Sequence, residues 1–438
     1  MIKIFLFFGL SCKIIFAGSE QQRRIGKSDV NSWEEHYSLG ANKSGYEPSI
    51  HYSDLSVVGA LVRDNIIFGT ATLVAPNFIV TAAHVPKDKL NDDPNSELHL
   101  WEFVPHHNID LAPPNLRYNI EEFIFHPAWI DRQVAVPNLG DGHKLGIDLA
   151  IARLNLNITG VSPARLPSSN DDPLGKRAIL AGFGDLVEGH TGNVDSSNVR
   201  RLGGENVIDR SVEKVAKENI SDDQRGGLLA IDFDTNFSQA NSLGQHFPIS
   251  NYHEGLEDAL ELLGGGTSEM TALPLESSTA HGDSGGPAFV FTKDSWRVHG
   301  VVSFGTNESK YGDVTLYTRL ASHYDWLLRE LPDWADSKLL DEFGWRQNPW
   351  LGILLPVSNG WVFHISLGWI YTPSPKGNDF WGWSHHLKNW IWLSDLAVPF
   401  VYCFDEEQPF WVYLDLEKSN GSSVRAYNYF TKSWKNYP

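Results

Sequence analysis

Short hydrophobic runs, separated by clusters of glycine, proline and asparagine, fill the chain between residues 57 and 320. Runs of this length bounded by such turn residues are typical of β-strands. Helical periodicity is rare in this region, and its best example, Glu254–Leu263, is short. The strands that we expect are Val57–Val62, Ile66–Val74, Phe78–Thr81, Leu149–Leu154, Ala178–Gly182 and Val298–Phe304. The body of the chain is therefore predicted to be all-β.

The pattern changes to a helical one at the end of this body. The segment Ala321–Leu331 has the period of an amphipathic helix, and Pro332 would end that helix. The residues on its hydrophobic face are Leu320, Tyr324, Leu327, Leu328 and Leu331. We therefore expect a linker over residues 332–343.

An aromatic repeat follows this linker. Trp369, Trp390 and Trp411 recur every 21 residues, each in an aromatic-x-aromatic triplet and each preceded by another aromatic pair across a polar turn. Alternate residues of a strand share one face, so each unit predicts a β-hairpin with its rings on one side. A lone hairpin cannot bury its own face, which predicts stacked hairpins over residues 344–438.

The first residues have the pattern of a secretory signal. Residues 1–17 carry an early lysine, an apolar stretch and a small residue at a possible cleavage point, and residues 18–55 form a polar arm. Removing the signal would leave Cys403 as the only cysteine, so no internal disulfide is expected. An exported protein without disulfides is typical of bacteria. We expect a secreted, periplasmic or cell-envelope location, and no later segment is apolar enough to predict a transmembrane helix.

Charge separates the body from the repeat segment. The 438 residues carry a net charge of −19, whereas residues 341–438 are close to neutral and hold 10 of the 16 tryptophans. A nucleic-acid-binding protein would show a basic face, so no nucleic-acid partner is expected.

Three short motifs carry candidate chemistry. His84 follows Thr81-Ala82-Ala83, Asp148 opens an apolar run, and Ser284 lies within Gly282-Asp-Ser-Gly-Gly-Pro287. A serine hydroxyl becomes a useful nucleophile when a histidine takes its proton, and a carboxylate can hold that histidine in one tautomer. Glycines beside the serine allow backbone N–H groups to converge on a developing oxyanion.

In the order His84, Asp148, Ser284, with gaps of 64 and 136 residues, these motifs resemble the trypsin/chymotrypsin-like serine proteases of bacterial type. The resemblance covers residues 56–331. It implies two Greek-key β-barrels with a C-terminal helix, a cleft between the barrels, and a β-hairpin repeat domain beyond them. It also implies that His84 is the general base and acid, Asp148 orients it, Ser284 is the nucleophile, and Gly282 and Ser284 form the oxyanion hole. It implies no metal and no cofactor.

The same resemblance suggests a specificity pocket. Ser278, six residues before the nucleophile, corresponds to the pocket base, where an acid would select arginine or lysine. Gly305 and Thr315 correspond to the pocket walls, and Ser303, Phe304 and Gly305 to the strand that pairs with substrate. A small or medium apolar side chain is therefore expected at the cleaved bond.

Some positions depart from the family pattern. Val85 and Ala280 stand where the family often has cysteines, and the family's activation motif is missing at Leu55–Gly59. Asp283 corresponds to the residue that in the family pairs with a freed N-terminal amine, and we expect another donor to it here. Asp232 and Asp234 could hold a cation, although a solvated acidic turn is the simpler interpretation.

Alternatives remain for both parts of the chain. The main hypothesis is an exported serine endopeptidase acting on polypeptides. A catalytically inactive binding or adhesion protein on the same fold, and an esterase with the same triad, stay open. For residues 344–438, the rings either form the core of the repeat, which we favour, or bind a polysaccharide or another cell-surface ligand.

Overall fold

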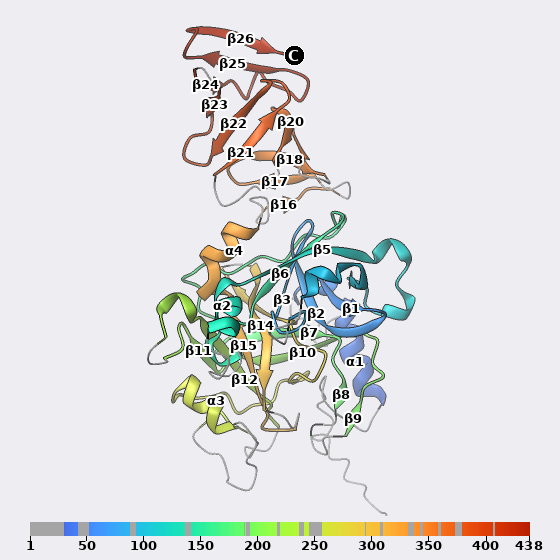
Figure 1. Ribbon diagram of the computed structural model, residues 1–438. Coiled ribbons are helices and arrows are strands. Elements are labelled where there is room, and N and C mark those ends of the chain that lie inside the picture. The colour runs from blue at the N-terminus through green and yellow to red at the C-terminus, as the bar shows by residue number, and fades with distance from the viewer. Residues whose placement is uncertain are drawn as a thin grey trace, which may run out of the picture.

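The computed structural model is a β-rich body that carries a narrower β domain at its C-terminal end (Figure 1). It describes residues 30–42, 52–87, 93–135, 142–187, 189, 193–216, 220–235, 241–244, 256–293, 295–306, 310–331, 337–341, 345–357, 361–372, 379–405 and 408–438. The predicted signal segment lies outside these residues, as does Pro332. Among the helices in the described part, none is long and apolar enough to cross a membrane.

The first half of the body is a closed barrel with strand order β1-β2-β3-β6-β5-β4. Its alternate residues, such as Leu61, Leu73 and Ile151, point inward and are buried. Strand β4 closes the barrel against β1, whereas β6 inserts between β3 and β5, which gives a Greek-key connection. The strands are β1 (Val58–Arg63), β2 (Ile66–Ala75), β3 (Phe78–Thr81), β4 (Trp101–Val104), β5 (Tyr118–Phe125) and β6 (Ala150–Leu154).

The second half is a 7-stranded sheet with strand order β10-β7-β13-β14-β15-β12-β11. All of its neighbouring strands are antiparallel. Its strands are β7 (Arg177–Gly182), β10 (Leu202–Val207), β11 (Arg210–Val212), β12 (Gly227–Asp232), β13 (Pro287–Thr292), β14 (Ser295–Gly305) and β15 (Val314–Arg319). A closed barrel followed by a curved half-barrel confirms the predicted all-β fold class of trypsin-like barrels. A short hairpin, β8 (Leu186–Val187) with β9 (Val194–Asp195), lies apart from this sheet.

Two of the four α-helices in the described part of the chain were expected. The closing helix is a 3-10 turn, Leu320–His323, that continues as α4 (Tyr324–Glu330), and α3 (Leu256–Leu263) matches the predicted helical stretch. The helix α2 (Pro127–Ala135) was not predicted, although proline at the first position of a helix is a known start signal.

The helix α1 (Val30–Gly40) lies within residues 18–55, for which the sequence predicts a polar arm. It packs against the second sheet: Leu39 is buried, and the Nδ1 atom of His36 lies 2.6 Å from the carbonyl oxygen of Gly203. The Nε–H of Arg201 donates to the carbonyl oxygen of Gly40. These partners are more than 160 residues away along the chain. Local sequence could not indicate that this polar segment docks on the body.

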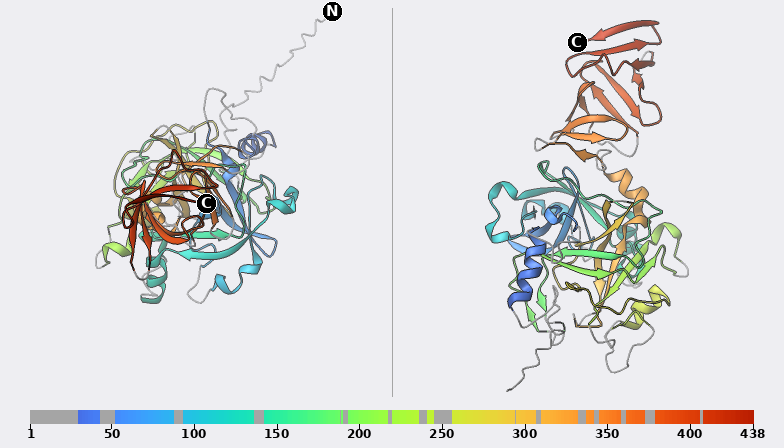
Figure 2. Two further views of the ribbon diagram at one scale, coloured as in Figure 1. Left: turned by 90° about the horizontal axis from the view of Figure 1, so that it is seen from above. Right: turned by 180° about the vertical axis from the view of Figure 1, so that it is seen from behind.

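The C-terminal domain is an 11-stranded antiparallel sheet in which each strand pairs with the next one along the chain. The two side views show it as a separate unit beyond α4 (Figures 1 and 2). Its strands are β16 (Lys338–Leu339), β17 (Arg346–Asn348), β18 (Gly352–Pro356), β19 (Trp361–His364), β20 (Gly368–Tyr371), β21 (Asp379–Ser384), β22 (Asn389–Ser394), β23 (Phe400–Phe404), β24 (Phe410–Leu414), β25 (Val424–Asn428) and β26 (Ser433–Tyr437).

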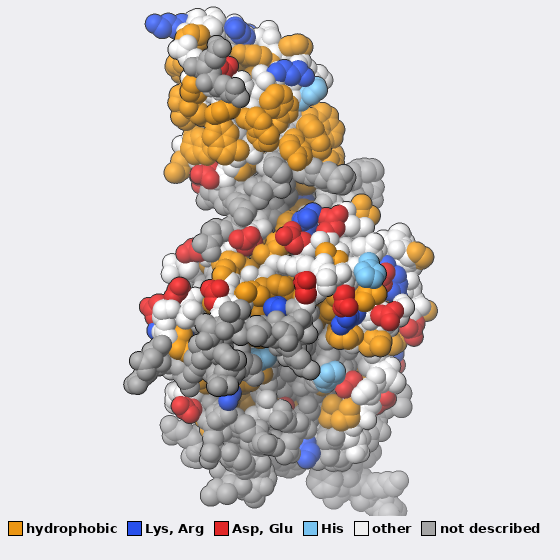
Figure 3. Space-filling view, in the orientation of Figure 1, with side chains coloured by type: hydrophobic (Ala, Val, Ile, Leu, Met, Phe, Trp, Pro, Cys, Tyr) orange, Lys and Arg blue, Asp and Glu red, His pale blue; other side chains and the backbone are white. Residues whose placement is uncertain are grey.

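The aromatic rings of this sheet lie mainly outside its core, contrary to our expectation. The core consists mostly of aliphatic side chains that alternate with the rings, such as Ile391, Val401 and Val412. Tryptophans on the opposite face are 40–47% exposed: Trp369, Trp381, Trp411 and Trp434. Hydrophobic side chains accordingly cover much of the visible surface of this domain (Figure 3). The stacked hairpins therefore bury aliphatic residues and display aromatic ones.

Two separate cores follow from this arrangement. The cluster around Leu61 belongs to the body and the cluster around Ile391 to the C-terminal sheet. A hydrogen bond from Asn157 Nδ2 to the carbonyl oxygen of Pro356, 2.9 Å long, joins the two parts.

We predict that Leu61→Ala and Ile391→Ala each lower the free energy of unfolding by about 2–5 kcal/mol, in different calorimetric transitions. Both side chains are at most 1% exposed, so each truncation leaves a cavity. Leu396→Ala is the control, because Leu396 is 94% exposed and its loss should move neither transition. A single transition that shifts with both buried substitutions would contradict two independently folding parts.

Candidate active site

Three loops at the junction of the two halves bring His84, Asp148 and Ser284 together. His84 follows β3, Asp148 precedes β6, and Ser284 precedes β13. The Nδ1 atom of His84 lies 2.7 Å from Asp148 Oδ2, and its Nε2 atom lies 2.8 Å from Ser284 Oγ. The backbone N–H of His84 donates to Asp148 Oδ1 at 2.9 Å. The arrangement is an unbroken chain of hydrogen bonds from carboxylate to hydroxyl.

The carboxylate of Asp148 is fully buried but well supplied with donors. Ser303 Oγ donates to Oδ2 at 2.6 Å, and Thr318 Oγ1 donates to the backbone carbonyl of Asp148 at 3.0 Å. Burial by itself raises the pKa of Asp148, but the charges and hydrogen bonds of His84 and His143 outweigh it and hold the pKa well below the usual range. Asp148 therefore stays ionised.

His143 was missed by the sequence analysis. Its Nδ1 atom lies 2.9 Å from Asp148 Oδ2, on the same oxygen that faces His84, and the two histidine rings are 4.8 Å apart. The oxygen of Asp148 and one nitrogen from each histidine lie within 4.8 Å of one another, close enough for a shared metal ion. These atoms are already joined by hydrogen bonds, so their positions need no ion to explain them. In the sequence, the signal was a histidine five residues before the aspartate.

The glycine turn around Ser284 has left-handed backbone at two positions. Gly282 has φ of 95° and Gly285 has φ of 83°, a region that side chains disfavour. A Cβ on Gly285 would lie 2.1 Å from Thr81 Oγ1, so no other residue fits there. Within the described part of the chain, no acceptor is recorded for the N–H groups of Gly282 and Ser284. These are the donors that the sequence predicted for an oxyanion.

Asp283, beside the nucleophile, accepts two backbone hydrogen bonds. The N–H of Gly184 donates to Oδ1 and the N–H of Ala280 donates to Oδ2, both at 2.9 Å. The carboxylate is buried at 0% exposure. Two backbone N–H groups of the protein therefore hold the turn through Asp283. This agrees with the expectation that a donor other than a freed N-terminal amine pairs with Asp283.

Thr70 on β2 ties this turn to the first barrel. Its Oγ1 donates to the carbonyl oxygen of Gly282 at 3.0 Å, and its N–H donates to the carbonyl oxygen of Ser284 at 2.8 Å. Thr70 was not predicted as a site residue, because a threonine in a strand carries no sequence signal of such a distant contact.

The predicted pocket residues meet beside β15. Ser278 Oγ and Thr279 Oγ1 each lie 2.9 Å from Thr315 Oγ1, and both Ser278 and Thr315 are buried. Gly305 pairs with Thr315 across the sheet, and a Cβ on Gly305 would lie 2.8 Å from the carbonyl oxygen of Val314. The base of the predicted pocket is thus lined with neutral hydroxyl groups.

The other two predicted substrate-binding residues contact the catalytic centre. The hydroxyl of Ser303 donates its hydrogen bond to Asp148 Oδ2, so a substrate would bind to the backbone of Ser303 and not to its side chain. The ring of Phe304 packs edge-on against His143 at 5.9 Å.

The acidic pair Asp232 and Asp234 is buried, so the prediction of a solvated turn is wrong. Both are at most 4% exposed, as is Asp209 beside them. Burial, reinforced by neighbouring carboxylates, raises the pKa of Asp209 to about 8 and that of Asp234 to about 11. Burial also raises the pKa of Asp232. Protonation removes the negative charge that burial disfavours.

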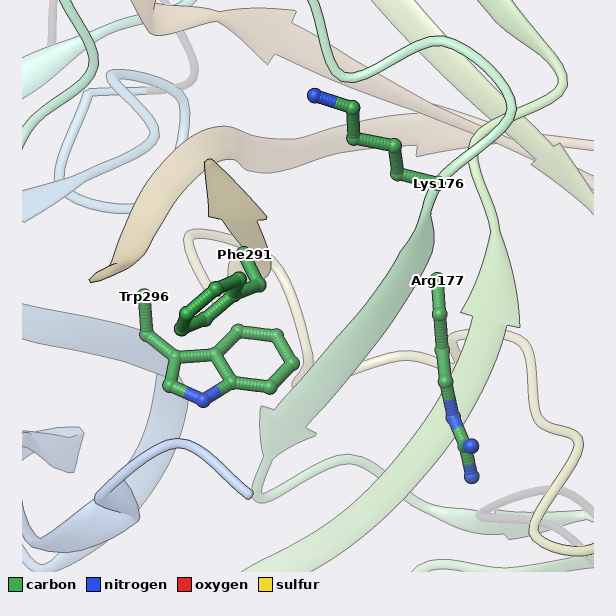
Figure 4. A pocket seen from close by; sticks show the side chains of 4 residues that line it. All are labelled: Lys176, Arg177, Phe291 and Trp296. Carbon is green, nitrogen blue, oxygen red and sulfur yellow. The ribbon is translucent and has the colours of Figure 1, made fainter. Parts of the chain in front are cut away.

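A shallow pocket of about 400 Å³ lies elsewhere on the body (Figure 4). Its lining residues are Lys176, Arg177, Phe291 and Trp296. Trp296 begins β14 whereas Ser303 lies near its end, which separates them by roughly 20 Å at 3.3 Å per residue. This pocket is not the substrate cleft.

His323 supports the loop that carries Asp148. Its Nε2–H donates to the carbonyl oxygen of Gly146 at 2.7 Å, and its Nδ1 atom lies 3.1 Å from His126 Nε2. Gly146 has φ of 64°, so the chain turns sharply two residues before Asp148.

Comparison with known proteins agrees with this geometry. The family model described as Trypsin matches residues 44–226 and 264–327. Chymotrypsin-C of Mus musculus is 37% identical over 57 residues, which cover 12% of this chain and 21% of the mouse protein. The chain thus spans about a fifth of the length of this curated relative.

We predict that the buried histidines His299 and His323 each lower the free energy of unfolding as the pH drops from about 6.5 toward about 4. The raised pKa values of Asp209 and Asp234 have the opposite effect, so the histidine contribution is measured as a difference between variants. Burial lowers the pKa of His299 and of His323 to about 4 in the fold, whereas an unfolded chain binds these protons near pH 6.5. At these two histidines the unfolded state therefore binds more protons in this window, and their contribution favours unfolding in acid. Denaturant titrations at several pH values will measure the effect.

His299→Gln should show a smaller loss over the same pH range, and the exposed His99→Gln should match the unsubstituted protein. An equal pH dependence in all three proteins would contradict the assignment to buried histidines.

Proposed function

Because the chain belongs to the trypsin family of serine proteases, we propose that it is a serine endopeptidase that hydrolyses polypeptides through an acyl-enzyme. The observation that carries the proposal is the hydrogen-bonded chain Asp148–His84–Ser284. Inactive proteins on such folds commonly lack a member of the triad, and here all three side chains are present in bonding geometry.

The geometry supports a stepwise mechanism. Ser284 Oγ attacks the scissile carbonyl while His84 Nε2 takes the hydroxyl proton, and Asp148 offsets the positive charge on the imidazolium. The N–H groups of Gly282 and Ser284 then stabilise the oxyanion. His84 returns the proton to the leaving amine, and a water molecule, activated in the same way, releases the acyl group from Ser284.

The pocket favours a small or medium apolar side chain at the cleaved bond. A lysine or arginine would meet the hydroxyl groups of Ser278 and Thr315 and find no counter-charge there. Asp232 lies one residue from the partner of Thr315 on β12, but the raised pKa of its carboxyl group disfavours a negative charge at that place.

We also propose that the protein is exported and that its C-terminal sheet binds a neutral polysaccharide. Half-exposed tryptophans repeat along one face of that sheet, and residues 341–438 are close to neutral. Neighbouring rings such as Trp383 and Trp390 pack edge-on at 6.1 Å. The half-exposed rings of Trp381 and Trp411 on the same sheet offer surface on which a sugar could stack.

Ser284→Ala is expected to abolish labelling by a fluorophosphonate and to reduce kcat by several orders of magnitude. Ser221→Ala is the control, because Ser221 is exposed and far along the chain from the triad. Labelling that persists in Ser284→Ala would refute the assignment of the nucleophile. An unlabelled native protein would favour the binding-protein alternative.

Cleavage of a peptide library should show an apolar preference at the cleaved bond, and Ser278→Asp should shift it toward lysine and arginine. A buried cation without a partner costs about 3–5 kcal/mol, which the new carboxylate would offset. A native preference for lysine or arginine would contradict the proposed pocket. Ester cleavage with no peptide cleavage would support the esterase alternative.

Retention on insoluble polysaccharide should be lost in the double variant Trp381→Ala and Trp411→Ala, with peptide hydrolysis unchanged. Each ring is at least 40% exposed, so its removal deletes a contact surface without opening the aliphatic core. Leu396→Ala, which removes an exposed aliphatic side chain from the same domain, is the matched control. Equal retention of all three proteins would refute the aromatic face as the binding surface.

A variant that ends at Ser337 should hydrolyse short peptides at close to the full-length rate. Every residue of the proposed site precedes Leu331, and the two parts have separate cores. An insoluble or inactive variant would mean that the sheet completes the protease core.

A further inference from the structure

The carboxylate of Asp148 faces two histidines instead of one. His143 lies in a 3-10 turn, Gly142–Leu145, shortly before Asp148 along the chain. Its Nδ1 atom is 2.9 Å from Asp148 Oδ2, a separation close to the 2.7 Å of His84 Nδ1. Ser303 Oγ is the third donor to this oxygen, at 2.6 Å.

The protons of this cluster can be placed from the chemistry of its atoms. An ionised carboxylate only accepts hydrogen bonds, so both Nδ1 atoms must carry hydrogen. Ser303 donates its single hydrogen to Asp148, and its oxygen then accepts from His143 Nδ1–H at 3.0 Å. His143 therefore donates toward two oxygens and locks the hydroxyl of Ser303 in one orientation.

The ring of His143 is held firmly by its surroundings. Trp129 from α2 packs edge-on at 5.5 Å, Phe304 from β14 packs edge-on at 5.9 Å, and the side chain is 12% exposed. Trp129 leaves no space beside Gly142, where a Cβ would lie 2.4 Å from the indole ring. The position of the imidazole is thus determined by both halves of the body.

We propose that His143 is a positioning residue, which as a neutral imidazole holds the carboxylate of Asp148 in the orientation that His84 requires. The proposal rests on the proposed function and adds a second histidine to the three residues of the triad. A carboxylate with one oxygen bonded to three donors cannot rotate away from His84 without breaking all three contacts. The benefit is a precise position of the reacting groups, because a small misplacement of these groups lowers the reaction rate by a large factor.

The neutral form of His143 is the working one. A second proton would place a positive charge on a ring 4.8 Å from His84, which itself becomes positive during the reaction. The described contacts of His143 include the titratable residues His84 and Asp148, and α2 and β14 contribute Trp129, Ser303 and Phe304.

The test compares His143→Leu, which removes the donor, with His143→Asn, whose side-chain N–H can take the place of Nδ1–H. For His143→Leu we expect kcat to fall roughly 10- to 100-fold with KM changed less than threefold. We also expect the acid limb of kcat/KM to move to higher pH, because a carboxylate with one donor fewer holds the proton on His84 more tightly. His143→Asn should recover most of kcat and return the acid limb of kcat/KM toward the lower pH of the native protein. His99→Leu, an exposed histidine of the first barrel, is the control.

A second measurement is independent of activity. Nitrogen-15 labelling of histidine should show two strongly deshielded imidazole N–H protons in the native protein, one from each histidine bonded to Asp148, and one of them should vanish in His143→Leu. A single such proton in the native protein would overturn the proposal, whether or not the protein is active.

The kinetic outcomes separate the two proposals. A native protein that no fluorophosphonate labels refutes the proposed function. A labelled native protein whose His143→Leu variant keeps its kcat, or changes only in KM, refutes the positioning role. Equal losses in His143→Leu and His143→Asn, with no shift of the acid limb, would show a packing role and also overturn the proposal.

Discussion

The buried negative charge of Asp148 organises the body of this protein. The carboxylate of Asp148 has no exposed surface, and an isolated charge in that position would be very costly. Its donors come from both halves: His84 and His143 from the first, Ser303 from β14 of the second. Thr318 on β15 binds its backbone. The two sheets must dock correctly to satisfy this charge, so the same contacts that hold the halves together also align the site.

The nucleophile depends on a second set of contacts across the same junction. The turn at Gly282–Gly286 follows a path that only glycine permits, and Asp283 fastens it to the backbone at Gly184 and Ala280. Thr70 reaches over from the first barrel to two carbonyl oxygens of the turn. Ser284 is thereby presented to His84 by the backbone and not by its own side-chain packing. This leaves the neighbouring N–H groups available for an oxyanion.

The C-terminal sheet is stabilised in a different way. A long meander has no closed barrel, and its hairpins are stable because each one buries aliphatic residues against the next. Ile391 and Cys403 are partners in this core, and burial raises the pKa of the cysteine to about 12. The aromatic residues alternate with them and remain half exposed. A periodic surface of rings is therefore a direct consequence of the strand period, and it suits the ligand class that we propose.

The sequence alone determined the features that depend on local pattern. These features depend on neighbouring residues: the strand runs, the closing helix, the 21-residue repeat and the glycine-rich turn around the serine. The order of His84, Asp148 and Ser284 along the chain indicated the fold family. Other features depend on contacts between segments that are distant along the chain, and these features are visible only in the folded protein. In the fold, α1 packs through Leu39 on a strand more than 160 residues away along the chain. Asp232 and Asp234 are buried, and His143 lies within hydrogen-bonding distance of Asp148. The fold also decides which face of each aromatic hairpin is covered. A period of two shows that the rings share a face, but whether that face is buried depends on which side of the sheet packs on itself.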